Sequence, residues 1–313
     1  MSRVGFREED RSMEAHQSFL DAWRISDVEP PLPEKVGPYH IEREIGKGTL
    51  GTVYLGRDTR SGAKVAVKTI PLADEFEEAH LERVRERFFS EAESASRLDH
   101  PAIVSIYEVG ESDNLVYVVM EYLEGRRLSE HITPDRLLPV PVVLELMARV
   151  AEAVDYAHRR SVMHGDLKPA NLLYKVETDE IKITDFGIAR LTDSGRTKTG
   201  IRLGTPSFTP PEQLAGEKMT NRSDLFSLGV ALYQLLTGRL PFQADSMTAL
   251  MHRIATDKHT PLNEARAELP ENLEEPVRRA LAKDPVDRFA RGSELALALR
   301  DQLAALTETK DRV

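Results

Sequence analysis

Three polar side chains with fixed spacing stand out in a stretch that is otherwise largely apolar. Asp166, Lys168 and Asn171 lie within the run Val162–Tyr174. Pro169 fixes its own φ and disfavours helical geometry at the residue before it, so we expect a loop of defined shape between two short strands. A carboxylate, an ammonium and a carboxamide on one such loop suit phosphoryl transfer, because they can take a proton, offset phosphoryl charge and bind Mg²⁺. A solvated turn after a helix is the alternative, and this loop alone leaves both open.

A glycine-rich segment comes earlier in the chain. Gly46, Gly48 and Gly51 form the pattern Gly-x-Gly-x-x-Gly, with strand-like sequence on both sides. A dinucleotide-binding motif of this kind opens a helix after a strand, so the flanking pattern instead predicts the tip of a β-hairpin. Glycines there let backbone N–H groups close over phosphates. The alternative is an ordinary hairpin turn, which needs one glycine rather than three.

A lysine lies within an apolar strand that follows the glycine-rich segment. Ala66 and Lys68 face the same side of this strand, because side chains alternate along it. Ala66 leaves room for a flat ring, and Lys68 would project toward phosphates beneath the glycines. A buried ammonium needs a counter-charge, and Glu91 is predicted to supply it. The alternative is a surface lysine on an edge strand with a solvated glutamate.

A third motif, Asp185-Phe186-Gly187, ends a strand that begins near Ile181. The acid can bind Mg²⁺, the aromatic ring can pack under the helix that carries the predicted glutamate, and the glycine lets the backbone turn. Asp-Phe-Gly occurs by chance in many proteins. Its position shortly after Asn171, with a short hairpin between, makes the pattern far more specific.

The apolar pattern around these motifs predicts an α+β fold with two lobes. Alternation with period two predicts a small antiparallel sheet with strands at Tyr39–Ile45, Thr52–Arg57, Lys64–Ile70, Ile103–Val109 and Leu115–Tyr122. One charged helix is expected in this lobe, at Glu75–Arg97. Helical patterns in the larger lobe begin at Pro141 and cover Arg222–Thr237, Ser246–Ala255, Asn272–Ala282 and Ser293–Ala305. A ligand cleft is expected where the two lobes meet.

Composition narrows the class of protein. The chain has 313 residues, long for one compact core, and is 41% hydrophobic and 30% charged, as in soluble globular proteins. Its formal net charge of −10 disfavours nucleic acid as a partner. The absence of cysteine excludes disulfides, thiol catalysis and cysteine-based zinc sites. No apolar run approaches the roughly 18 residues of a membrane span, so a cytoplasmic protein is expected.

The first 38 residues differ from the rest. An apolar stripe that includes Phe19 and Trp23 predicts a short amphipathic helix, and a proline-rich linker follows it. A single stripe is usually packed against its own domain, which we prefer to a partner-docking element. The expected parts are an extension (1–38), a main domain (39–305, with lobes 39–122 and 123–305) and a tail (306–313).

Together these motifs resemble those of the eukaryotic-type (Hanks-type) serine/threonine protein kinases. The resemblance covers about Tyr39–Ala305 and is strengthened by Gly204–Glu212, Ser223–Gly229 and Asp284–Phe289. The amino-acid sequences of Asp99–Val104 and Pro211–Gln213 are most like those of the bacterial members. The resemblance implies the bilobal protein-kinase fold, ATP with Mg²⁺ or Mn²⁺ as cofactors, and Ser/Thr hydroxyls of proteins as phosphoryl acceptors.

The resemblance also implies a role for each motif residue. Asp166 would accept the substrate proton, Lys168 would contact the γ-phosphate, and Lys68, paired with Glu91, would hold the α- and β-phosphates. The implied metal ligands are Asn171 and Asp185. The implied nucleotide pocket consists of Ile45, Gly46, Gly48, Gly51, Val53, Ala66, Lys68, Met120, Glu121, Leu123 and Leu173. The implied scaffold is the ion pair Glu212–Arg288, together with Asp224 as a brace of the catalytic loop.

The sequence departs from the family pattern at Gly165, where most members have an arginine that receives the phosphate of a phosphorylated activation loop. We therefore expect activity to depend weakly on loop phosphorylation, although Thr197 or Thr199 could be autophosphorylated. Two rivals remain: a small-molecule kinase of the aminoglycoside or choline type, which also uses His-Gly-Asp, and a pseudokinase scaffold. The resemblance leaves a homodimer open and names no substrate.

Overall fold

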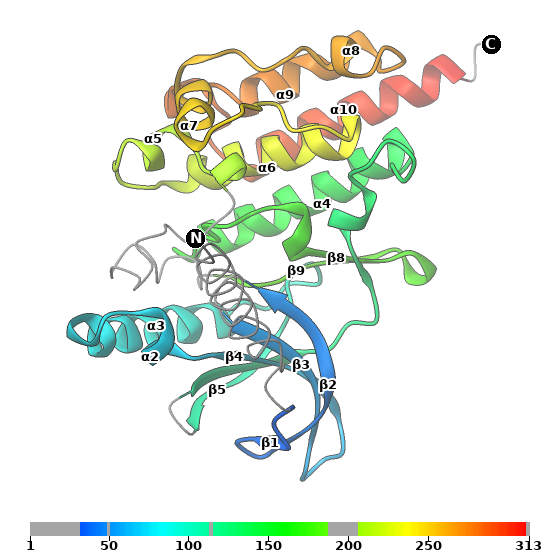
Figure 1. Cartoon of the computed structure of the whole chain (residues 1–313). Coiled ribbons are helices and arrows are strands. Elements are labelled where there is room, and N and C mark those ends of the chain that lie inside the picture. The colour runs from blue at the N-terminus through cyan, green and yellow to red at the C-terminus, as the bar shows by residue number, and fades with distance from the viewer. Residues whose placement is uncertain (1–31, 49–50, 113–114, 187–205, 311–313) are drawn as a thin grey trace, which may run out of the picture.

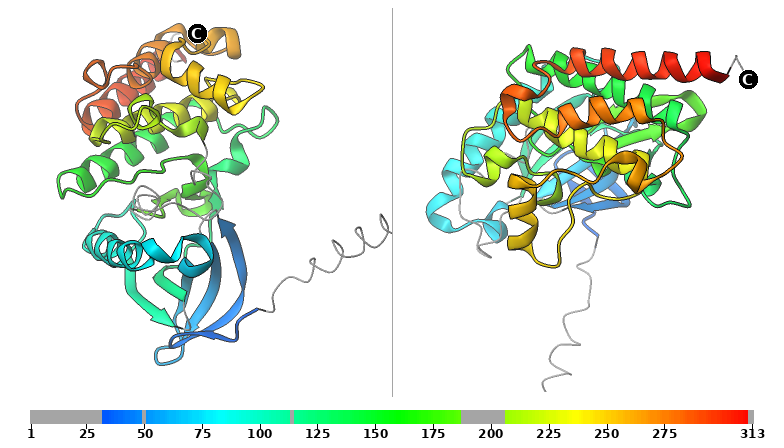
Figure 2. Two further views of the ribbon diagram at one scale, coloured as in Figure 1. Left: turned by 60° about the vertical axis from the view of Figure 1, so that its left-hand side comes forward. Right: turned by 90° about the horizontal axis from the view of Figure 1, so that it is seen from above.

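A computed structural model of the chain describes residues 32–48, 51–112, 115–186 and 206–310. These residues form a strand-rich lobe and a mainly helical lobe, with the lobes one above the other in Figure 1. The left-hand view in Figure 2 shows the same division. The predicted two-lobed α+β fold is confirmed. The predictions about Phe19, Trp23, Gly187, Thr197 and Thr199 concern residues outside the described ranges.

The small lobe is built on an antiparallel sheet that, among the described residues, has six strands in the order β1-β2-β3-β4-β6-β5. Its strands are β1 (Lys35–Val36), β2 (Tyr39–Gly48), β3 (Gly51–Asp58), β4 (Lys64–Ile70), β5 (Ile106–Ser112) and β6 (Leu115–Glu121). Alternate residues of β4 point to opposite faces of the sheet. Ala66 and Ile70 join one apolar cluster, whereas Val65 and Val67 join another. The central strands are therefore buried on both sides.

The helical part of the small lobe differs from the single helix predicted for Glu75–Arg97. It consists of α2 (Leu72–Glu75), a 3₁₀ turn (Glu78–His80) and α3 (Leu81–Ser96). Phe76 causes the first break, because its backbone is extended (φ −117°, ψ 152°) and its side chain is fully buried. Burial of one aromatic ring in the core therefore outweighs the local helical preference.

The large lobe is organised around two central helices, α4 (Val140–His158) and α6 (Asn221–Thr237). α6 begins at Thr220 with a capping box and ends at Gly238 in the left-handed conformation (φ 73°). The other helices are α5 (Pro211–Leu214), α7 (Met247–Thr256), α8 (Leu262–Ala265), α9 (Glu274–Ala280) and α10 (Gly292–Lys310). α10 packs against α4 and is longer than predicted. Among the described helices, none is long and apolar enough to cross a membrane.

A second, small sheet lies where the lobes meet. It contains β7 (Arg126–Arg127), β8 (Leu172–Lys175) and β9 (Glu180–Ile183), in that order. β8 follows the loop that carries Asp166, and β9 leads into Asp185, so these strands hold two of the predicted motifs at the lobe junction. A parallel bridge between Ile103 and Ile183 connects this sheet to the segment that leads into β5.

Candidate active site

The loop that carries Asp166, Lys168 and Asn171 brings the three side chains into direct contact. Lys168 Nζ lies 2.6 Å from Asp166 Oδ2. Asn171 Nδ2 donates to the same oxygen at 3.1 Å and to the backbone carbonyl of Asp166 at 2.8 Å. Pro169 begins a 3₁₀ turn that ends at Asn171, as expected from its fixed φ. The loop is therefore a defined structure, which disfavours the alternative of a solvated turn.

A buried carboxylate of α6 anchors this loop by hydrogen bonds to its backbone. Asp224 is 1% exposed, and its two oxygens accept hydrogen bonds from the backbone N–H groups of His164 (2.9 Å) and Gly165 (2.8 Å). His158 Nε2 of α4 lies 2.8 Å from Asp224 Oδ2. Burial raises the pKa of the Asp224 carboxyl, but the bond to His158 and the charges nearby outweigh it and lower the pKa. The predicted brace is confirmed.

Gly165 has a backbone conformation that favours glycine. Its φ of +81° lies in the left-handed region, which L-residues with a Cβ enter only at a cost. The N–H of Gly165 points at Asp224 Oδ1 in this conformation. The residue that distinguishes this chain from most of the resembled family thus relieves backbone strain beside Asp166.

Lys68 reaches across the cleft to the third motif. Its Nζ lies 2.6 Å from Asp185 Oδ1, and the two side chains are 8% and 20% exposed. Asp185 has φ +65°, an uncommon conformation for a residue other than glycine. Burial raises the pKa of the Asp185 carboxyl, but the charge of Lys68 and its hydrogen bond outweigh this effect and lower the pKa.

Glu91, predicted to pair with Lys68, lies on α3 with Oε1 at 3.7 Å from Arg87 Nε. Lys68 therefore has Asp185 as its described partner, and its pairing with Glu91 stays a prediction. Phe186 is 4% exposed and joins the large-lobe core, which also includes Ala95 of α3. Its ring packs against His164, with the ring centroids 4.7 Å apart.

A cavity of about 290 Å³ opens between the lobes. Seven of the predicted pocket residues line it, together with the predicted metal ligand Asp185: Ile45, Val53, Ala66, Met120, Glu121, Leu123 and Leu173. Gly46, Gly48, Gly51 and Lys68, also predicted for the pocket, are not among the lining residues. The glycine-rich segment is the β2–β3 hairpin, in which Gly48 pairs with Gly51. Arg127, which we did not predict, also lines the cavity. Its signal in the sequence was a pair of arginines directly after the junction glycine, Gly125.

The two predicted metal ligands lie on neighbouring segments. The backbone N–H of Thr184, the residue before Asp185, donates to the backbone carbonyl of Asn171 at 2.9 Å. Since Asn171 Nδ2 donates to Asp166, the amide oxygen faces away from that carboxylate. Asp185 Oδ2 is not the oxygen that Lys68 engages. A carboxylate oxygen and an amide oxygen are ligands that suit Mg²⁺.

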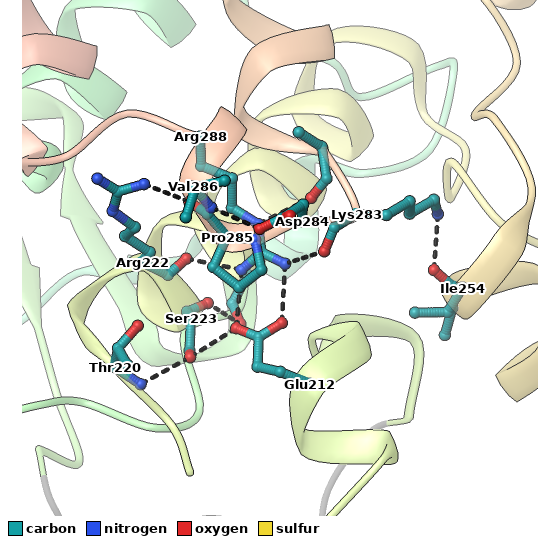
Figure 3. A network of polar contacts seen from close by, with 12 residues as sticks. Glu212, Thr220, Arg222, Ser223, Ile254, Lys283, Asp284, Pro285, Val286 and Arg288 are labelled. Carbon is teal, nitrogen blue, oxygen red and sulfur yellow. Dashed lines mark hydrogen bonds and ion pairs between the residues drawn. The ribbon is translucent and has the colours of Figure 1, made fainter. Parts of the chain in front are cut away.

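The predicted pair Glu212–Arg288 is confirmed in the interior of the large lobe. Two guanidinium–carboxylate bonds of 2.8 Å join them, as Figure 3 shows. The remaining donors of Arg288 reach the carbonyls of Ala282, Arg222 and Lys283, and Ser223 donates to Glu212 Oε1. Burial raises the pKa of the Glu212 carboxyl, but Arg288 and Ser223 outweigh it and lower the pKa.

Two lobes, a pocket at their junction and a polar loop connected to that pocket through Arg127 together define the bilobal kinase fold. The chain belongs to the protein kinase family: the protein kinase domain model matches residues 39–298. The PknI kinase domain of Mycobacterium tuberculosis is similar, with a TM-score of 0.69 and 30% identity over 87% of this chain and 100% of that chain. The predicted family is therefore confirmed.

Curated relatives are bacterial serine/threonine kinases. The chain is 38% identical to serine/threonine-protein kinase PrkC of Bacillus subtilis over 254 residues, which cover 81% of this chain and 38% of the relative. It is 35% identical to serine/threonine-protein kinase PknB of Mycolicibacterium smegmatis, over 82% of this chain and 41% of the relative. The chain thus spans about two fifths of the length of these relatives.

Proposed function

We propose that this chain transfers the γ-phosphoryl group of MgATP to Ser or Thr hydroxyls of protein substrates. The observation that carries the proposal is the contact of both Lys168 and Asn171 with the carboxylate of Asp166, on a loop anchored by Asp224. This arrangement presents a positioned proton acceptor beside a cation, as phosphoryl transfer requires. The names of the bacterial relatives support the choice of Ser and Thr.

In this proposal each part of the cleft has one task. The apolar walls hold adenine, Lys68 orients the phosphates, and Asp166 accepts the proton of the attacking hydroxyl. Asn171 and Asp185 would hold Mg²⁺ or Mn²⁺, which would supply positive charge to stabilise the transferring phosphoryl group. Glu91 would pair with Lys68 and balance its charge.

The direct test compares the full chain with its Asp166→Asn variant on MgATP and casein or myelin basic protein, with radiolabelled γ-phosphate. We expect phosphoserine or phosphothreonine from the wild type and a loss of about 10²–10⁴-fold in the variant, the usual contribution of a general base. Asp301→Asn, which changes an exposed carboxylate on α10, is the matched control. Transfer only to an aminoglycoside or choline would favour the small-molecule alternative, and no transfer at all would favour the scaffold.

We further propose that activity depends weakly on phosphorylation of the activation loop. The support is Gly165, which has no side chain to receive a loop phosphate. Phosphatase treatment, or the pair Thr197→Ala and Thr199→Ala, should leave most of the activity on casein. Loss of most activity in either experiment would contradict this proposal. The cytoplasmic location, the homodimer and a docking role of residues 1–38 stay predictions.

A further inference from the structure

Arg127 occupies a particular place in the cleft. It is the last residue of β7, directly after the lobe junction, and it lines the cavity that faces Asp185 and Leu173. Its Nη1 donates to the backbone carbonyl of Ala170 at 2.6 Å. Ala170 lies on the loop between Lys168 and Asn171, so this bond fixes one edge of the guanidinium beside the polar loop.

The other edge of the guanidinium faces the glycine-rich hairpin. A Cβ placed on Gly46 would lie 2.9 Å from Arg127 Nη2, closer than real Cβ atoms normally approach another heavy atom. Gly46 therefore makes room for this side chain. The side chain of Arg127 therefore lies between the small lobe and the large lobe. A nucleotide that extended from the apolar walls of the cavity to the predicted metal ligands would pass through this space.

The guanidinium of Arg127 has no direct carboxylate partner among the described residues. Within the described ranges its side chain forms no ion pair, and Glu130 instead accepts a hydrogen bond from its backbone N–H. The positive charge of Arg127 acts on Asp185 at the inner end of the cleft. Burial raises the pKa of the Asp185 carboxyl, Lys68 lowers it, and Arg127 lowers it more weakly. A guanidinium has five donors and no acceptor, so an anion is its natural partner.

We propose that Arg127 is a nucleotide-positioning residue that binds the phosphate chain of the nucleotide from the large-lobe side, opposite the glycine-rich hairpin. This inference rests on the proposed function, because it takes ATP as the ligand of the cavity. It adds a second cation to the site, on the opposite side of the cleft from Lys68.

The test is calorimetric titration of the full chain with MgADP and with adenosine, which differ in the phosphates. Arg127→Ala should weaken MgADP about tenfold, the loss of one hydrogen bond to a charged group, and leave adenosine unchanged. Arg127→Lys, which keeps the charge without the fork, should fall in between. Arg126→Ala, at the exposed neighbour in β7, is the matched control and should bind both ligands as the wild type does.

The ratio of the two affinities is the decisive number. A general loosening of the loop, caused by loss of the bond to Ala170, would weaken adenosine and MgADP alike and would overturn the proposal. Unchanged or tighter binding of MgADP to Arg127→Ala would also overturn the proposal. Arg127 would then either make no contact with the phosphates or obstruct the nucleotide. If Arg127→Ala does not fold, Arg127→Gln is judged by the same ratio.

The outcome is separable from that of the proposed function. Wild-type chain that transfers phosphoryl groups to casein, together with an unchanged ratio in Arg127→Ala, would refute the inference alone. If the ratio of MgADP affinity to adenosine affinity falls in Arg127→Ala and the wild type transfers no phosphoryl group, the proposed transfer is refuted and the phosphate contact is supported.

Discussion

Two ion pairs, one in the scaffold and one in the cleft, differ in their surroundings. Glu212 and Arg288 are 5% and 0% exposed, and several further hydrogen bonds satisfy both side chains (Figure 3). Lys68 and Asp185 are 8% and 20% exposed and, among the described residues, are joined by a single hydrogen bond. Asp185 also has a left-handed backbone.

The difference teaches how to separate stability from chemistry in this fold. A charge whose hydrogen-bonding groups are all satisfied inside the protein has nothing left for a ligand, so the pair in the large lobe acts as a structural connection. The pair in the cleft is different, because Asp185 lines the cavity and its carboxylate is open to a ligand there. The same reasoning places Asp224 with the scaffold, since both of its oxygens are used by the loop and His158.

The largest effect on stability is expected from Arg288→Met. Removal of one partner leaves Glu212 buried without a counter-charge, which costs about 3–5 kcal/mol. We expect the free energy of unfolding in urea to fall by that amount. The double variant Glu212→Leu, Arg288→Met should recover part of the loss, because no unpaired charge remains. Equal stability of the wild type and the single variant would show that the buried pair is not a scaffold element.

Lys68→Met should reduce activity strongly and stability only slightly, the opposite of Arg288→Met. Loss of the cation that faces the phosphates is expected to lower the rate of transfer to casein by about 10²–10³-fold, as for other preorganised electrostatic contacts. The loss of unfolding free energy should be smaller than that of Arg288→Met, because Asp185 can gain solvent from the cavity. A variant with intact activity and strongly reduced stability would place Lys68 with the scaffold instead.

Gly165→Ala tests whether the left-handed backbone of the catalytic loop contributes to stability rather than to catalysis. A Cβ at φ +81° costs about 1–2 kcal/mol, so we expect that reduction in the free energy of unfolding. Transfer to casein should change much less than in Lys68→Met, because the residue presents no side chain to the reaction. A neutral effect on stability would mean that the loop adopts another conformation in solution.

The smallest effect concerns Lys283, whose Nζ donates to the carbonyl of Ile254 at 2.6 Å near the end of α7 (Figure 3). Burial lowers its pKa to about 8. Since the unfolded side chain titrates near pH 10.4, the unfolded chain binds more protons between about pH 8 and 10, and stability rises with pH there. Relative to Lys283→Met, the wild type should gain about 1 kcal/mol between about pH 7.5 and 9.5 in urea unfolding. A flat difference would contradict this expectation.

The amino-acid sequence by itself determined the features that depend on neighbouring residues. Strand alternation identified β2, β3, β4, β5 and β6, because their apolar positions repeat with the geometry of the strand. Asp166, Lys168 and Asn171 meet because only a few residues separate them and Pro169 restricts the loop. The motif order was enough to name the family, which the domain match confirms.

Only the tertiary structure decided which distant groups meet. Lys68 contacts Asp185, 117 positions away, a pairing that the sequence pattern did not predict. Arg127 became part of the cleft because β7 brings it between Gly46 and Ala170, which no local period encodes. Phe76 interrupted a helix because its ring has a place in the core. In each case the free energy comes from contacts between segments far apart in the chain, and these exist only once the lobes have folded.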